Sequence, residues 1–354
     1  GTMENLMNVG MTTNKSNTNF DVLCIHHNDM DGYASAMCAK LSPLWRKKTF
    51  KFISAHYDMA FDFSKLKKSQ YVFILDFSLP VQYFDELVDR VGIDHIIWID
   101  HHLSSINKYK NYPNINAVPG IRINGLAACA LSYLHFFRSV VQLDETTLFD
   151  PGMEVSVNGC EVTLESLLSP SMDGLFPKSV RMAGLYDTWR FTTYEDYITN
   201  LMFNDGFYAE FERPSNESCD FWDAFFDMKL SQDVTNQIMV SGKPIVDYKN
   251  RTFVTDLQRA GFECYIRKFE DIDAIAINTL DRGSFIFETV KNDYEVGLVF
   301  FMNADGKMEY SIYRLGKHPE KSILVNKIAE SFGGGGHAGA AGFLTNGTLV
   351  VERK

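Results

Sequence analysis

Three apolar segments in the N-terminal part of the chain each run into acidic residues, and two of them also run into histidines. The segment at 21–25 leads into His-His-Asn-Asp-Met-Asp-Gly, the one at 71–76 ends in Asp76, and the one at 95–100 is followed by two histidines. A further acid, Asp187, follows an apolar helical pattern. One aspartate after a strand is most simply the N-cap of the next helix, but capping needs neither paired aspartates nor adjacent histidines. The set therefore predicts one shared chemical site.

Carboxylate and imidazole groups in these numbers are typical ligands of divalent cations. The candidates are His27, Asp29, Asp31, Asp76, His101 and Asp187. Four negative charges balance two divalent ions, and mixed ligation of this kind favours manganese, with magnesium or iron also compatible. Two such ions about 3.5–4 Å apart hold a phosphoryl group and lower the pKa of a bridging water. Because the sequence has no GxSxG, P-loop or CGSC pattern, we expect metal-assisted hydrolysis of a phosphoester.

The segments that carry these residues alternate with helical patterns up to about residue 190. The ranges 21–25, 71–76 and 95–100 are predicted strands, and 81–92 and 126–139 are predicted helices. Apolar strands separated by helices predict a parallel sheet that is covered on both faces. In such a sheet, ligands bind outside the carboxyl ends of the strands, where the acidic residues are expected.

The pattern changes after Phe191. The following stretch is helical and aromatic-rich, with expected breaks at Pro214 and Pro244, and strands return from about residue 262. A hairpin turn is expected at Asn158-Gly159. The predicted organisation is a disordered tail at 1–19, a metal-binding catalytic domain at 20–194, a helical linker at 195–260 and a smaller α/β domain at 261–354.

The ordered motifs resemble those of the DHH phosphoesterase superfamily. The similarity rests on HNDMDG at 27–32, the isolated Asp76, the triplet at 100–102 and Asp187. The segment FGGGGHAGAAGF at 332–343 is similar to the glycine-rich motif of the associated DHHA1 domain. The resemblance covers the chain from about residue 20 to the end. It implies a parallel-sheet DHH domain joined by a helical linker to a DHHA1 domain, with the active site in the cleft between them.

The same resemblance implies which residues hold each ion. One ion would be bound by His27, Asp29 and Asp76, and the other by Asp31, Asp76, His101 and Asp187. Asp76 would therefore bridge the two ions.

Further roles follow from the same family pattern. Asp100 would orient His101, since metal-bound imidazoles need such a partner, and His102 would face the scissile phosphate. Many relatives place the first histidine four residues before the first aspartate, where this chain has Ile25. Others read HNDxDG, so we favour His27, while the register leaves His26 as the alternative.

The glycine run is predicted to bind an anion. Most glycine runs are flexible spacers, but this one lies between a predicted helix and a strand and contains one histidine. Glycine also lets backbone N–H groups approach an anion closely. The resemblance makes Gly334, Gly335, Gly336 and His337 a clamp for the phosphate or sugar of a nucleotide, assisted by Arg314. A solvated strand arginine is the alternative for Arg314.

A metal site and an anion clamp on two domains favour short substrates. Short oligonucleotides, cyclic dinucleotides and 3′-phosphorylated adenosine nucleotides fit, and relatives of this length include nanoRNA-degrading enzymes and bisphosphate nucleotidases. The net charge of 34 − 45 = −11 disfavours long duplexes. Alternatives are a phosphomonoesterase on 3′-phosphoadenosine-type nucleotides, or a pyrophosphatase or exopolyphosphatase. The alternative that is not an enzyme is an inactive protein that binds a nucleotide as a sensor.

The remaining features predict a cytoplasmic protein that does not associate with membranes. Six cysteines show no CxxC spacing, the N-terminus lacks the apolar region of a signal peptide, and no apolar run approaches the roughly 18 residues of a membrane span. The sequence is compatible with a homodimer and does not determine the oligomeric state. Trp98 and Trp189 flank motifs and are expected to belong to the core rather than to stack on bases.

Overall fold

The computed structural model describes residues 19–142, 154–157, 160–163, 165–168, 174–217, 219–280 and 283–354. The expected turn at Asn158-Gly159 and the expected tail, apart from Asn19, lie outside the described residues. By its own contacts the chain divides into two compact units. The first reaches His101 and resumes over Ser105–Ile245, and the second contains His102–Ser104 and Val246–Lys354. The domain limits drawn from the sequence stay predictions.

A four-stranded parallel sheet forms the centre of the first unit, as predicted. In spatial order its strands are β2 (Phe50–Ala55), β1 (Val22–His27), β3 (Tyr71–Leu75) and β4 (Ile96–Ile99). All neighbouring pairs run parallel. The sequence pattern does not reveal β2, because this edge strand is only partly buried and Lys51 and Ser54 interrupt its apolar residues.

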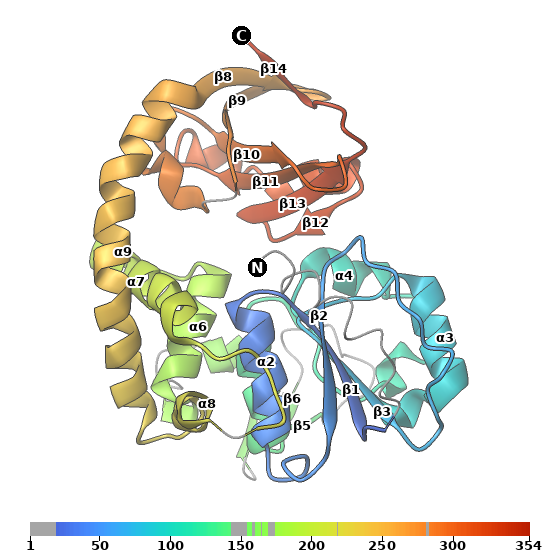
Figure 1. The fold of residues 1–354 in the computed structure, drawn as a ribbon. Coiled ribbons are helices and arrows are strands. Elements are labelled where there is room, and N and C mark those ends of the chain that lie inside the picture. The colour runs from blue at the N-terminus through green and yellow to red at the C-terminus, as the bar shows by residue number, and fades with distance from the viewer. Residues whose placement is uncertain are drawn as a thin grey trace. The chain divides into compact units, whose positions relative to one another are not determined.

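Helices cover both faces of this sheet. Along β1, Val22 and Cys24 point into one core, whereas Leu23 and Ile25 point into another. A parallel strand that is buried on both faces requires this continuous apolar run. The first core packs against α2 (Met30–Leu41), α5 (Ala128–Phe137) and α6 (Lys178–Thr188), and the second packs against α3 (Val81–Val91) (Figure 1).

The helical stretch after the first core contains α7 (Tyr194–Glu210), α8 (Asp220–Phe225) and α9 (Ser231–Ala260). Pro214 lies between α7 and α8, as expected, but the break expected at Pro244 is wrong, because this residue lies inside the 30-residue α9. A proline inside a helix frees the carbonyl four residues earlier. Here that residue is Val240, which is 75% exposed, so water is able to hydrate the freed carbonyl.

The second unit contains a seven-stranded sheet that is mostly antiparallel. In spatial order its strands are β12 (Gly335–Gly336), β13 (Ala340–Thr345), β11 (Met308–Arg314), β10 (Val296–Met302), β9 (Phe269–Asn278), β8 (Gly261–Ile266) and β14 (Val351–Arg353). Only β9 and β10 pair in parallel. Helix α10 (Val325–Ser331) contributes Val325, Ile328 and Ala329 to the core of this unit.

Short elements complete the described chain. A small antiparallel sheet contains β5 (Val141–Gln142), β6 (Glu154–Val157) and β7 (Cys160–Thr163). The other short elements are α4 (Leu103–Lys108) and the 3₁₀ helices at Ile93–His95, Ile115–Ala117, Glu165–Leu168, Ser284–Val290 and Pro319–Lys321.

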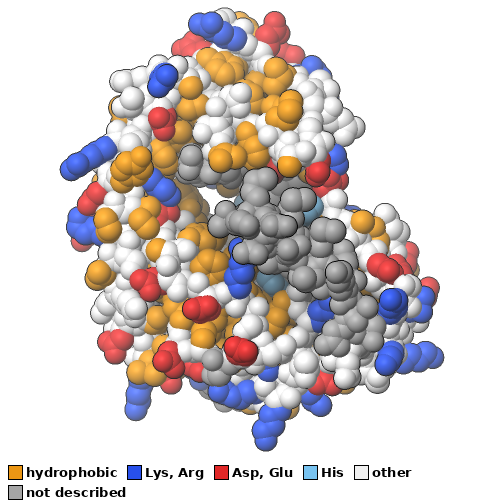
Figure 2. Space-filling model, in the orientation of Figure 1, with side chains coloured by type: hydrophobic (Ala, Val, Ile, Leu, Met, Phe, Trp, Pro, Cys, Tyr) orange, Lys and Arg blue, Asp and Glu red, His pale blue; other side chains and the backbone are white. Residues whose placement is uncertain are grey.

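Among the described residues, no helix has both the length and the apolar character needed to cross a membrane. On the face shown in Figure 2, lysine and arginine side chains are scattered among acidic ones. Free thiols are found at Cys24, Cys38, Cys129, Cys219 and Cys264.

Candidate metal centre

The strand order of the parallel sheet defines where a ligand site is expected. The chain passes from β1 to β2 on one side and then to β3 on the other, so the direction of winding switches between β1 and β3. His27 is the last residue of β1, and Asp76 directly follows β3. Open α/β sheets bind ligands outside the carboxyl ends of the strands at such a switch point. His27 and Asp76 therefore lie at the edge of the sheet where a ligand site is expected.

One group of candidate ligands contains His27, Asp29 and Asp76. His27 Nδ1 lies 2.9 Å from Asp29 Oδ2 and 4.0 Å from Asp76 Oδ2. Asp29 is also the N-cap of α2, because its Oδ1 accepts a hydrogen bond of 2.9 Å from the Gly32 N–H. One oxygen caps the helix while the other faces His27. Capping and ligation therefore do not exclude each other at this aspartate.

Gly32 holds this arrangement through close backbone packing. A Cβ atom at this position would lie 2.0 Å from the His27 carbonyl oxygen. The first turn of α2 thus packs directly onto the end of β1, which only a residue without a side chain permits. The glycine of the HNDMDG motif therefore helps to position the candidate ligands that precede it.

The second group converges on one imidazole nitrogen. His101 Nε2 lies 3.1 Å from Asp31 Oδ2, 3.2 Å from Asp76 Oδ1 and 3.1 Å from Asp187 Oδ2. A single ring nitrogen carries at most one proton and cannot donate to three carboxylates. Ligand atoms on a small octahedral cation, by contrast, lie about 3 Å apart, given metal–oxygen distances of about 2.1 Å. The spacing therefore fits the ligand shell of a divalent ion.

Among the described residues, buried ligand atoms in both groups also lack a hydrogen bond of acceptable geometry. They include His27 Nδ1 and Asp187 Oδ2, one in each group. Each lies about 3 Å from a candidate ligand atom of the other type, imidazole nitrogen against carboxylate oxygen, without hydrogen-bond alignment. Buried ligand atoms that face each other in this way fit a bound cation, because the cation satisfies both lone pairs.

Asp76 faces both groups at once. Its Oδ2 is directed toward His27 and its Oδ1 toward His101. Its backbone has φ 57°, in the left-handed region, which is uncommon outside glycine and tolerated best by Asp and Asn. The Asp76 N–H donates to the Ile99 carbonyl at 2.9 Å, which ties this turn to β4. Strained positions of this kind persist where the surrounding structure fixes them, and they cluster at functional sites.

Asp31 is hydrogen-bonded to the N-terminus of α5, a contact that no sequence motif predicts. Its Oδ1 accepts a hydrogen bond from the Cys129 N–H at 2.7 Å, and its Oδ2 accepts one from the Ala128 N–H at 3.1 Å. Both donors lie at the N-terminus of α5, where backbone N–H groups have no acceptor within the helix. Burial raises the pKa of Asp31, but His101 and the amide donors outweigh it, so the net pKa is lowered. Helix α5 therefore stabilises the ionised carboxylate.

The pKa values of Asp76 and Asp187 are shifted in the opposite direction. Burial, together with Asp31 and Asp29, raises the pKa of Asp76 well above its usual value. Burial and Asp31 raise the pKa of Asp187 to about 6. Like charges in a buried site favour protonation unless cations balance them. Divalent cations would provide that balance, and their binding would displace the protons.

The two alternatives for the first histidine have different surroundings. His26 is buried, and its ring centroid lies 5.6 Å from that of Tyr33 and 6.3 Å from that of Phe52. Burial lowers the pKa of His26 to about 4, so the ring is neutral. Of the pair, His27 is the residue that lies beside Asp29. The geometry thus favours His27, while its role as a ligand stays a prediction.

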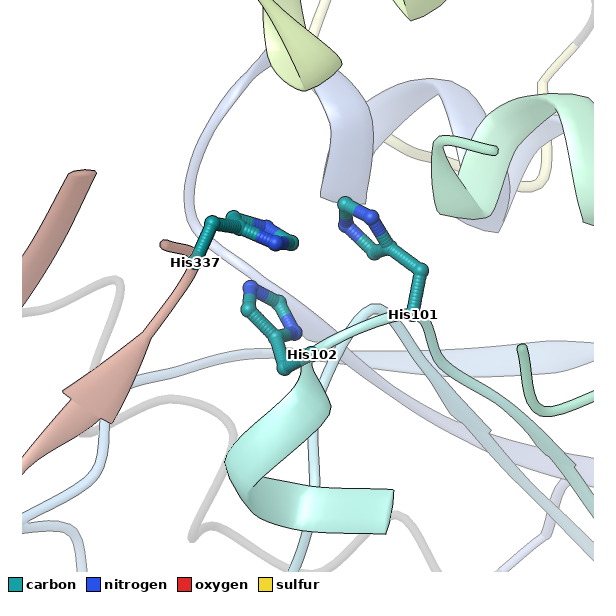
Figure 3. Close-up of side chains that lie close together, drawn as sticks. All are labelled: His101, His102 and His337. Carbon is teal, nitrogen blue, oxygen red and sulfur yellow. The ribbon is translucent and has the colours of Figure 1, made fainter. Parts of the chain in front are cut away.

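The backbone of the Asp-His-His triplet is held by side chains on either side. Asp100 Oδ1 accepts a hydrogen bond of 2.8 Å from the His101 N–H, and Asn124 Nδ2 donates to the His101 carbonyl at 2.9 Å. His101 and His102 project from the turn between β4 and α4 (Figure 3). No sequence motif points to Asn124, because only the fold brings its loop to this turn.

The glycine run of the second unit is largely engaged in secondary structure. The N–H groups of Gly333 and Gly334 donate to carbonyls at the end of α10 at 3.0 and 2.9 Å, and that of His337 donates to Ala340 at 2.7 Å. Gly335–Gly336 pairs with β13. Three backbone donors of the run are therefore used inside the unit, and its role in binding an anion stays a prediction.

Arg314, predicted to assist this run, and His102, predicted to face the scissile phosphate, both lie near the glycine-rich segment. The Arg314 N–H donates to the Gly339 carbonyl at 3.0 Å, and its exposed guanidinium donates to the Ile323 carbonyl at 3.3 Å. His102 groups with the second unit, and its ring stacks on that of His337 with centroids 5.0 Å apart (Figure 3). The structure therefore places Arg314 beside Gly339 and His102 beside His337, and the clamp itself stays a prediction.

Two tyrosines lie near the carboxylates and could not be predicted from the sequence. The Tyr57 ring lies 6.0 Å from the His27 ring, and the Tyr208 hydroxyl accepts a hydrogen bond of 2.8 Å from the Met30 N–H. Both tyrosines are distant in sequence from the motifs they contact, so no spacing rule reveals them.

The prediction that both flanking tryptophans belong to the core is correct for one of them. Trp98 is 1% exposed, but Trp189 is 46% exposed, so its assignment to the core is wrong. Trp189 ends α6 in the left-handed conformation, with φ 55°, and this turn directs the chain out of the helix at the surface.

Comparison with known proteins shows similarity in structure rather than in sequence. No protein-family model and no curated protein matches the chain. Among solved structures, the DHH domain of a member of a family of ribosomal proteins aligns with a TM-score of 0.50 at 13% identity, over 97% of this chain and 87% of that one. The fold is that of a DHH domain.

Other solved structures align more loosely. The pGpG-specific phosphodiesterase PggH from Vibrio cholerae aligns with a TM-score of 0.39 at 14% identity, over 91% of this chain and 92% of that one. RecJ from Thermus thermophilus in complex with Mn²⁺ aligns with a TM-score of 0.39 at 12% identity, over 98% of this chain and 52% of that one. At such identities a likeness concerns the fold alone, and the activity must be argued from the site.

Proposed function

We propose that this protein is a DHH-type phosphoesterase that depends on divalent cations and hydrolyses phosphodiester bonds in short oligonucleotides or cyclic dinucleotides. The observation that carries the proposal is the position of Asp76, whose two oxygens face two separate groups of carboxylate and imidazole ligands. The DHH fold and the ordered motifs support it. The second unit is proposed to be a DHHA1 domain on the basis of the glycine-rich motif.

The residues of the chain fit two cations. His27, Asp29 and Asp76 would hold one, and Asp31, Asp76, His101 and Asp187 would hold the other. Divalent cations in such a pair supply a hydroxide nucleophile at neutral pH and neutralise charge on the phosphoryl oxygens. Manganese is proposed from the ligand types, with magnesium and iron as alternatives.

The protein itself fixes the ligands in place before substrate binds. The N-terminus of α5 holds Asp31, the turn after β3 holds Asp76, and the carboxylate of Asp100 holds the backbone at His101. Ligands held in this way need no rearrangement during the reaction, which is where preorganised sites derive their catalytic advantage. We propose that His102 donates a hydrogen bond to the phosphate under attack.

Substrate size is inferred from charge and from the second unit. Arg314 and His337 provide a cation and a hydrogen-bond donor for a second point on a nucleotide. Long duplexes need many cationic phosphate contacts, which a chain of net charge −11 does not favour.

A substrate panel tests the proposal. Purified protein would be stripped with a chelator, reloaded with Mn²⁺, Mg²⁺ or Fe²⁺, and given linear dinucleotides, cyclic dinucleotides, 3′-phosphoadenosine 5′-phosphate and pyrophosphate. We expect hydrolysis of the phosphodiesters by the reloaded protein and none by the stripped protein. Turnover of the monoester or of pyrophosphate alone would instead support those alternatives. Nucleotide binding without turnover under every metal would indicate a sensor.

A further inference from the structure

Trp189 occupies an unusual position beside the carboxylate cluster. It follows Asp187 by two residues, so the two Cα atoms lie within about 7 Å of each other. Asp187 Oδ2 in turn lies 3.1 Å from His101 Nε2. The backbone that carries the indole therefore lies next to the carboxylate cluster.

The backbone at Trp189 is one that bulky residues rarely adopt. Its φ of 55° and ψ of 44° are left-handed, the conformation in which a helix usually ends on glycine. A side chain there crowds the carbonyl oxygen, so a large residue in this conformation needs an explanation in packing or in function. Packing alone does not provide it, because the side chain is 46% exposed.

The indole is nevertheless held rigidly. The rings of Tyr186, Phe191 and Tyr197 contact it with centroids 5.6, 5.0 and 5.4 Å away and interplanar angles of 65°, 71° and 67°. All three contacts are edge-to-face, the favoured geometry for aromatic pairs. Tyr194, which is 60% exposed, extends the aromatic surface through Tyr197. A large π-surface is thus fixed in orientation and partly open to solvent.

We propose that Trp189 is a stacking platform for a nucleobase of the substrate whose phosphate is held by the carboxylate cluster. The proposal rests on the phosphodiesterase function proposed above and specifies that the substrate carries a base next to the scissile phosphate. Stacking on an aromatic ring tolerates every base, because each base has a π-face. The platform therefore selects nucleotides over other phosphoesters without selecting a sequence.

Kinetics on matched substrates tests the platform. Wild-type protein, Trp189→Phe and Trp189→Gly would be compared on a dinucleotide and on the same dinucleotide with one base removed. Removing the base is expected to raise the KM of wild-type protein about tenfold. Trp189→Phe should keep most of this preference, and Trp189→Gly should abolish it while kcat on the abasic substrate stays within about twofold.

Two controls separate stacking from folding. Glycine relieves the left-handed strain at position 189, so a loss caused by backbone distortion is avoided, and thermal unfolding would confirm that the variant folds. Tyr248→Ala, which removes a 69% exposed aromatic ring from α9, should leave the base preference unchanged. Equal loss on both substrates in Trp189→Gly, or an unaltered base preference, would overturn the platform.

A binding measurement distinguishes this inference from the proposed function. The emission of Trp189, taken as the difference between wild-type protein and Trp189→Phe, should be quenched by the dinucleotide and not by its abasic form, with the same cation present. Quenching without hydrolysis would keep the platform and reject the phosphodiesterase. Hydrolysis with neither quenching nor base preference would reject the platform alone.

Discussion

The carboxylate cluster of the first unit and the glycine run of the second both stand out in the sequence, yet they use their polar groups differently. In the cluster, His27 Nδ1 and Asp187 Oδ2 are buried without a hydrogen bond in the described chain. In the glycine run, the N–H groups of Gly333, Gly334 and His337 already donate to carbonyls of their own unit. A conspicuous motif thus offers candidate ligand atoms in one case and builds backbone structure in the other. The proposed binding role of the second region therefore depends mainly on its side chains.

Substitution of Asp76 is expected to have the strongest effect on the carboxylate cluster. Asp76→Ala should lower kcat/KM by about 10³-fold or more and remove both metals, because one carboxylate faces both ligand groups. Metal content by mass spectrometry and turnover of a dinucleotide would be measured together. Asp89→Asn, which removes an exposed carboxylate on α3, is the matched control and should behave as wild type. An active Asp76→Ala protein would reject the two-metal centre.

A smaller effect should separate the two adjacent histidines. His101→Ala should lose metal, because its Nε2 lies about 3 Å from three carboxylates. His102→Ala should keep metal near the wild-type level and lower kcat about 10²-fold, as loss of a hydrogen bond to the transition state would do. Metal analysis and kinetics on the same preparations check this division. Equal metal loss in both variants would contradict it.

Gly32 tests how the fold positions the cluster. Gly32→Ala should lower the free energy of unfolding by about 2 kcal/mol and weaken metal binding, because the new methyl group would meet the His27 carbonyl at 2.0 Å. Denaturant unfolding and metal titration provide the two readouts. Gly174→Ala is the control, since nothing lies within 4 Å of its Cβ position, and it should change stability by less than about 0.5 kcal/mol.

A weaker effect on activity is expected from a substitution in the glycine run of the second unit, because this run is proposed to contact the substrate away from the reacting phosphate. His337→Ala should raise the KM for a dinucleotide about tenfold and leave hydrolysis of bis-p-nitrophenyl phosphate unchanged, because the ester is too small to need a second contact. The same series would extend to linear RNA of about twenty nucleotides. Efficiency should fall with length in the wild-type protein. Equal or rising efficiency would indicate an exonuclease that accepts long strands.

Much of the first unit follows from local sequence. Apolar strands such as 71–75 are predictable because both faces of a parallel sheet exclude water, and the acids after them lie where such sheets bind ligands. The edge strand β2 and the uninterrupted helix around Pro244 are not predictable in this way. The partly exposed residues of β2 give no continuous apolar run. At Pro244 the local signal predicts a break, but the exposed Val240 leaves the freed carbonyl accessible to water, so the helix continues.

The types and order of the candidate ligands are predictable from local sequence, since charge and strand periodicity are local properties. The fold is needed to show which oxygen of Asp76 faces which histidine, that α5 holds Asp31, and that Asn124 holds the triplet. These contacts join residues tens of positions apart, and their geometry depends on how helices pack onto the sheet. The surroundings of Trp189 are also decided by the fold, which brings Tyr186, Phe191 and Tyr197 against its ring.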